Sequence, residues 1–248
     1  MWYPSGMRSA LITFKPAFPS SSRIRYKGLN PPGKESHVWA EEYNRNWKEI
    51  FTVESEVAQI IAGKLNAAIT PDEKQIIEKV PTTNLTAYDF YLRGRREQWK
   101  FWSNNENREA LKNAADLYNN ALEYDSSFAQ AYIGLASVFL DKHYWETYFS
   151  ENFLDSVLIL ADIALKYDTQ LSEAYTFRGY YYSQMGKSEQ AIEEFDKAIQ
   201  LNSNDWMAYQ GKGIFFDGID RVEAIYNLHK SVLLNRVYNP VHQNHLSR

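Results

Sequence analysis

The chain has 248 residues, of which 44% are hydrophobic and 15% aromatic, and it contains no cysteine. Such a chain can bury a sizeable core, and the lack of cysteine excludes disulfides and thiolate chemistry. The net charge is −4, but the first 34 residues carry six Lys or Arg and no acid, so residues 35–248 carry −10. An acidic body argues against nucleic-acid binding by that part, because binding phosphates requires basic clusters.

No apolar run approaches the roughly 18 residues of a membrane span. The stretch Ala10-Leu11-Ile12 is too short to be the apolar part of a secretory signal. We therefore expect a cytoplasmic protein without membrane contact. The lead at residues 1–35 is basic and rich in Pro and Ser, which predicts a poorly ordered or irregular segment.

Two short strands are predicted next, at residues 23–27 and 37–40, around the turn-forming residues 30–33. Apolar residues at helical spacing then predict a helix from Val53 to Ala68.

Polar residues mark two further helix starts. Thr70 is placed as a helix cap, with Pro71 at the first helical position and Glu73 where a capping box requires it. Asn84 lies in a glycosylation-like triplet, but we expect it to cap the helix that starts at Leu85.

A helical repeat occupies most of the remaining chain. Aromatic residues near helix starts recur at Tyr132, Tyr175 and Tyr209, with spacings of 43 and 34 residues. A small residue late in the following helix recurs at four positions: Ala121, Ala164, Ala198 and Ser231. Repeats of this kind bury a continuous core between paired helices and supply binding surfaces rather than chemistry.

The pattern is clearest in residues 172–205. Its members are Tyr175, Gly179 and Tyr182 in the first helix, Gly186 in the turn, and Ala191, Phe195 and Ala198 in the second helix. This pattern resembles the tetratricopeptide repeat (TPR), a unit of two antiparallel helices. The resemblance implies a mainly α fold, a right-handed helical solenoid, with small residues where helices cross.

Residues 84–238 are expected to form about four such units, and residues 239–248 the start of a truncated further repeat. The first unit exceeds the family period by about eight residues around Trp102–Arg108, and a polar loop is predicted at residues 104–107. The second exceeds it by nine residues at His143–Phe149, which either lengthen both helices or form a loop.

Proline, usual at the end of each unit in this family, is absent. The residues at that position are Ser126, Thr169, Ser203 and Arg236. An Asp, Asn or Ser near the helix end can favour the turn instead, so the pairing of helices is still expected.

A second resemblance rests on an ordered series of short motifs. They are His37-Val38-Trp39-Ala40-Glu41-Glu42-Tyr43, Glu54-x-Glu56-Val57-Ala58, Thr70-Pro71-Asp72-Glu73-Lys74 and Ala87-Tyr88-Asp89-x-Tyr91-Leu92-Arg93-Gly94. Together they resemble bacterial regulatory proteins in which a TolB-like α/β domain precedes TPR units. The resemblance implies that residues 36–83 are a remnant of that domain and a linker helix, so a small partial α/β segment, a β-hairpin plus helices, precedes the solenoid. Family members carry a winged helix, a class III nucleotide cyclase or a protein kinase further upstream, and the motifs of those domains are absent here.

Few residues are candidates for catalysis, metal binding or phosphate binding. His242 and His245 have no third ligand nearby, and their register makes them packing positions. Gly211-Lys212-Gly213 lacks the spacing of a phosphate loop, and His143 has no partner nucleophile. We therefore expect a non-enzymatic protein with no catalytic residue, no metal and no cofactor.

In TPR arrays the first helix of each unit lines a groove. The register predicts nine groove residues: Gln130, Ile133, Ser137, Thr176, Tyr180, Gln184, Met207, Gln210 and Ile214. This surface is mixed and uncharged, and it lacks the Lys and Asn pair with which some family members clamp a peptide carboxylate. We expect an extended or helical peptide held by Tyr180, Met207 and the amide side chains. The alternative is that these residues merely face solvent.

The leading hypothesis is a protein-interaction scaffold that binds a peptide or partner domain within a bacterial signalling or transcription-regulatory protein. One alternative is the regulatory or oligomerisation segment of a nucleotide cyclase. Another is a self-associating fragment, a homo-oligomer, because an incomplete repeat at residues 238–246 exposes apolar faces.

Overall fold

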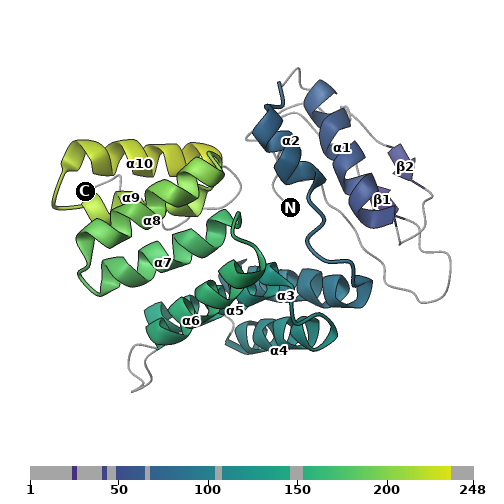
Figure 1. The fold of residues 1–248 in the computed structure, drawn as a ribbon, viewed down its shortest axis with the longest axis horizontal. Helices are drawn as coiled ribbons and strands as arrows, with labels where there is room; N and C mark the ends of the chain where they lie inside the picture. Colours follow the sequence, from purple (N-terminus) through teal and green to yellow (C-terminus); the bar gives the residue numbers. More distant parts are fainter. Residues whose placement is uncertain are drawn as a thin grey trace. The chain divides into compact units, whose positions relative to one another are not determined.

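The computed structural model describes residues 24–26, 41–43, 49–64, 68–103, 108–145 and 153–235. The chain divides into two compact units, one formed by residues 81–231 and the other by residues 1–80 with 232–248. Figure 1 shows the elements coloured along the sequence.

The described part of the smaller unit begins with two short strands. Strand β1 (Ile24–Tyr26) pairs antiparallel with β2 (Glu41–Tyr43), and Ile24 lies opposite Tyr43. The first predicted strand is therefore confirmed. The partner strand β2 begins directly after the predicted 37–40, which lie outside the described residues.

Two helices follow, α1 (Ile50–Lys64) and α2 (Pro71–Glu78). Helix α1 starts three residues before the predicted Val53, and its described part ends before the predicted Ala68. Its buried residues Val57 and Ala58 lie about one turn before Ala62, so the three share one face, as an amphipathic helix requires.

The predicted capping box at α2 is confirmed. The Glu73 amide donates to Thr70 Oγ1 at 3.2 Å, and the Thr70 amide donates to Glu73 Oε2 at 2.9 Å. Two amides at the helix start that would otherwise lack a partner are thereby satisfied. Pro71 occupies the first turn, where its missing N–H costs nothing.

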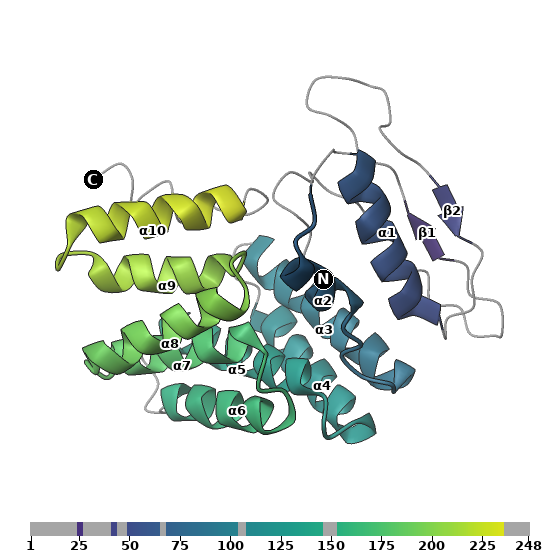
Figure 2. The ribbon, with the colours of Figure 1, turned by 45° about the horizontal axis from the view of Figure 1, so that its top comes forward.

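The larger unit is a row of helix hairpins (Figures 1 and 2). Its helices are α3 (Leu85–Ser103), α4 (Arg108–Tyr124), α5 (Ala129–Trp145), α6 (Phe153–Tyr167), α7 (Ser172–Gln184), α8 (Ser188–Leu201), α9 (Trp206–Phe216) and α10 (Arg221–Leu234). The first helices α3, α5, α7 and α9 contact one another in order, while α4, α6 and α8 each pack on their own first helix and on the next. The mainly helical array of hairpins expected from the repeat is confirmed.

Side chains shape the helix ends. Asn84 Oδ1 accepts from the amides of Thr86 and Ala87, each at 3.1 Å, so Asn84 caps α3 as predicted. Asn84 also donates to the Tyr124 carbonyl at 2.7 Å, which ties the start of α3 to the end of α4.

The connections between hairpins share one type of turn. Asp125, Asp168 and Asn202 each accept, through the side-chain oxygen, the amide two residues on, at 2.9, 3.1 and 3.1 Å. This is the Asx turn, which reverses the chain without proline. It accounts for a regular repeat in which Ser126, Thr169 and Ser203 replace the usual proline.

Aromatic rings fill the space between neighbouring first helices. A Cβ added at Gly179 would lie 2.6 Å from Phe195 Cε1, and one at Gly211 would lie 2.5 Å from the same atom. Gly94 and Gly134 flank Tyr118 in the same way, at 2.8 and 2.6 Å from its Cε1. Each of these rings therefore requires a small residue in the first helices on both sides.

The two insertions begin by lengthening helices. Helix α3 runs on to Ser103 and α5 to Trp145, so the described part of each insertion is helical. Residues 104–107 and 146–152 lie outside the described part of the chain.

Candidate partner-binding site

The candidate site is the surface built by successive first helices, here called the first-helix face. It comprises the side chains of α3, α5, α7 and α9 at the repeat positions of the nine predicted groove residues. Adjacent first helices are joined across this face by polar contacts, and these decide which side chains remain available to a partner.

At the junction of α7 and α9, two side chains of α7 bind the start of α9. Thr176 Oγ1 donates to Asp205 Oδ2 at 2.9 Å, and the Tyr180 hydroxyl donates to the Met207 carbonyl at 3.0 Å. Asp205 also caps α9 by accepting from the Met207 and Ala208 amides, each at 3.1 Å. Burial raises the pKa of the Asp205 carboxyl and the charge of Glu173 raises it further, while the hydrogen bonds from the Ala208 amide and the Thr176 hydroxyl oppose that rise.

Three of the predicted groove residues are largely covered in the structure. Thr176 is fully buried, Tyr180 is 6% exposed and Ile133 is 8% exposed. The reason is that the next first helix or the core covers them, so their side chains join repeats. A partner bound to this face would not contact Thr176, and it would contact Tyr180 and Ile133 only at their edges.

The junction of α3 and α5 is a partly buried polar cluster, the Gln98 joint, formed by Gln98, Tyr118, Ser137 and Asp141. Gln98 Nε2 donates to Ser137 Oγ at 2.6 Å and to Asp141 Oδ2 at 3.0 Å. The Tyr118 hydroxyl donates to Gln98 Oε1 at 2.9 Å. Burial raises the pKa of Asp141 to about 7, against a lowering by Gln98.

Sequence reasoning missed Asp141, although a signal existed. Asp141 lies nine residues after Tyr132, just as Gln184 lies nine after Tyr175. The register that selected Gln184 therefore selects Asp141. Gln98 was harder to find, because the insertion in the first unit hides the register of the end of α3.

The other six predicted residues keep part of their surface. Gln184 and Ile214 are exposed, Ile214 by 44%, while the half-buried members are Gln130, Ser137, Met207 and Gln210. Gln184 Nε2 lies 3.4 Å from the Tyr144 hydroxyl of α5, which links the second and third hairpins. The available surface is thus a stripe of amide and apolar groups over α5, α7 and α9.

Helix α3 adds charge to this face. The guanidinium carbon of Arg95 lies 5.9 Å from the centroid of the Tyr91 ring. Burial raises the pKa of Tyr91, Arg95 lowers it and Glu173 raises it, so one charge of each sign lies near this ring. The nine residues of the predicted uncharged surface include none from α3, so this charge is an addition to that surface.

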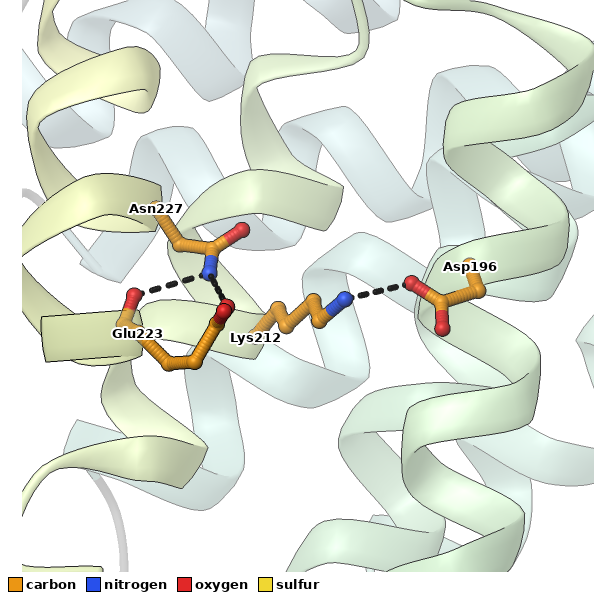
Figure 3. Close-up of polar contacts among 4 residues, drawn as sticks. All are labelled: Asp196, Lys212, Glu223 and Asn227. Atoms are coloured by element: carbon orange, nitrogen blue, oxygen red, sulfur yellow. Dashed lines mark hydrogen bonds and ion pairs between the residues drawn. The ribbon is translucent and has the colours of Figure 1, made fainter. Parts of the chain in front are cut away.

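Ion pairs join the helices away from this face. Lys212 Nζ of α9 lies 2.6 Å from Asp196 Oδ1 of α8, and Arg178 of α7 lies 3.6 Å from Asp162 Oδ1 of α6 (Figure 3 shows the first pair). Both pairs connect a second helix with the following first helix at the same repeat position. Lys212 is therefore a structural cation, and Gly213 abuts Leu228, in agreement with the packing role predicted for this segment.

The remaining candidates for chemistry give no assembled site. His143 contacts the ring of Tyr144 edge to face, and burial lowers its pKa. His242 and His245 lie outside the described residues. Within the described ranges, no three His, Asp or Glu side chains are grouped so as to hold a metal, and no helix has the length and apolar character to cross a membrane.

Comparison with known proteins identifies the class of repeat. Residues 172–205 match the tetratricopeptide repeat, so the α7–α8 hairpin is a TPR unit. The other three hairpins described above share its register.

Over 165 residues the chain is 29% identical to a protein of Rhizobium meliloti (strain 1021) named "Putative adenylate cyclase 3". The match covers 65% of this chain and 26% of that protein, so the chain spans about a quarter of the relative's length.

Solved structures with a similar arrangement include a thermophilic TPR protein of Thermus thermophilus, at 14% identity, covering 79% of this chain and 97% of that one, with a TM-score of 0.49. MamA of Desulfovibrio magneticus is another, at 16% identity, covering 77% of this chain and 96% of that one, with a TM-score of 0.41.

Proposed function

We propose that this chain is a non-enzymatic scaffold whose first-helix face binds a peptide segment of a partner protein. A TPR fold is consistent with a protein-interaction scaffold. The observation that carries the proposal is the stripe of partly exposed amide and apolar side chains on three successive first helices, among them Gln130, Gln184, Gln210, Met207 and Ile214.

The chemistry of this stripe suits the main chain of an extended peptide. Each Gln side chain both donates and accepts hydrogen bonds, so it can pair with peptide N–H and C=O groups without selecting one sequence. Met207 and Ile214 offer apolar contact at the α9 end. Residues 35–248 carry −10, so the bound segment is expected to be neutral or basic.

The test is to select peptides from a random display library on the purified chain and to measure their affinities by fluorescence polarisation. We expect Ile214→Lys to weaken binding about tenfold, because it places a hydrated charge on the stripe. The matched control is Ile159→Lys on α6, a second helix, where the isoleucine is 57% exposed. Equal affinities for both variants, or a library that yields no binder, would refute the proposal.

A second candidate function is favoured by the Rhizobium meliloti match. In this view the array is the regulatory or oligomerisation segment of a longer bacterial signalling protein with a nucleotide cyclase. Sequencing the DNA on the 5′ side of the coding region tests it. A cyclase domain in the same reading frame supports this function, and a winged-helix domain supports transcriptional control instead. An in-frame stop codon before any such domain excludes both functions.

Further expectations from the sequence accompany the proposed scaffold function. They are a cytoplasmic location and the division into segments 1–35, 36–83, 84–238 and 239–248. The alternative carried from the sequence is self-association as a homo-oligomer. Sedimentation velocity over a concentration series tests the last. A sedimentation coefficient that does not change over the series would exclude self-association in that range.

A further inference from the structure

We propose that the Gln98 joint is a pH-sensitive connection between the first two repeats, in which the packing of α3 on α5 around the buried Asp141 is most stable when Asp141 is protonated and becomes less stable when it ionises. The proposal concerns the fold itself and stands whether or not the first-helix face binds a peptide.

The geometry isolates the Asp141 carboxylate from compensating charge. Asp141 is 5% exposed, and the hydrogen bond described for it comes from the neutral amide of Gln98. A buried ionised carboxylate needs a cation or several donors to offset its lost hydration. Asp205 is similarly buried and accepts more donors, two backbone amides and the Thr176 hydroxyl, yet burial still raises the pKa of its carboxyl.

The groups around Asp141 do not supply the missing charge. Gln98 faces it from α3 and the neutral Tyr118 phenol lies next to Gln98 from α4. Arg95 of α3 acts on Tyr118, and Lys142 follows Asp141 on α5. Apart from burial, the influence found on the pKa of Asp141 is that of Gln98, so no charged group of α3, α4, α6 or α7 shifts it appreciably.

Protonation therefore favours the folded joint. The pKa of Asp141 rises from 3.8 to about 7 on folding, so between those values the folded protein binds more protons than the unfolded chain. The stability that Asp141 contributes is then present at low pH and is lost as pH rises toward 7. Ser137 shares the Gln98 amide with Asp141, so ionisation also affects a residue of the first-helix face.

The experiment compares thermal unfolding of wild type, Asp141→Asn and Asp116→Asn at pH 5 and pH 8. Asn keeps an oxygen to accept from Gln98 but carries no charge. We expect Asp141→Asn to melt at least about 2 °C above wild type at pH 8, with a clearly smaller difference at pH 5. Asp116 is exposed on α4, so its variant reports the general effect of removing one negative charge.

A second measurement keeps the test valid if Asp141→Asn fails to fold. The side-chain carboxyl of Asp141 in the wild type is titrated by ¹³C NMR, with its resonance assigned by comparison of labelled variants. A midpoint near 7 supports the joint. A midpoint in the ordinary aspartate range, or a melting difference that is the same at both pH values, would overturn it.

Discussion

At the scale of residues, buried hydroxyl groups hold neighbouring repeats together. Thr176 and Tyr180 were selected by register as groove residues, yet each donates a hydrogen bond to the following first helix. Register alone indicates which side of a helix a residue occupies. It does not indicate whether the next helix covers that position. A covered side chain joins two repeats, whereas an uncovered one is available to a partner.

Replacing Thr176 with valine should lower the free energy of unfolding by about 1–3 kcal/mol. The change keeps the shape of the side chain but leaves the buried Asp205 carboxylate one donor short. Chemical denaturation measures it. Thr86→Val is the control, since Thr86 is exposed on α3, and it should change stability by less than about 0.5 kcal/mol. Similar losses for both variants would mean that the Thr176 hydroxyl has no special role.

At the scale of elements, the large and the small residue of a core contact can stand on either of the two helices that meet there. Tyr118 and Phe195 lie in second helices and each abuts a glycine sixteen residues later, Gly134 and Gly211. In the second unit the large and small residues are reversed, because Ala161 stands in the second helix and Phe177 sixteen residues later. Both are buried in the same cluster, so the space is filled from the opposite side.

This reversal predicts that substitutions at Ala161 and Phe177 have strongly coupled effects on the free energy of unfolding. Ala161→Phe alone should cost about 1–3 kcal/mol by overpacking, and Phe177→Gly alone about 3–5 kcal/mol through the cavity it leaves. The double variant reproduces the arrangement of the other two units and should lose at least about 1 kcal/mol less than the sum. A double-mutant cycle from denaturant unfolding measures this, and additive losses would contradict the proposed exchange of volume.

The hairpins and their caps were predictable from sequence because they depend on local chemistry. Thr70 with Glu73, and Asn84 at α3, have their helix-capping partners within three residues. The Gln98 joint was not predictable in this way. It brings together residues about 20 to 40 positions apart, and their approach depends on how α3, α4 and α5 pack.

At the scale of the larger unit, the hairpins present one continuous face of first helices, and packing leaves only part of it available. The buried residues of that face join the repeats, while Gln184, Gln210 and Ile214 keep surface for a partner. The same face carries opposite charges near Tyr91 at the α3 end. A partner segment lying along α5, α7 and α9 would therefore meet amide and apolar groups first.

Site-specific photo-crosslinking tests this account most directly. A photoreactive phenylalanine replaces Ile214 in one variant and Ile159 in another, and each is irradiated with the tightest peptide selected from the library. We predict crosslinked product from position 214 and at most a trace from position 159, which lies on a second helix. Crosslinking chiefly from position 159 would show that partners bind elsewhere and would contradict the first-helix face as the working surface.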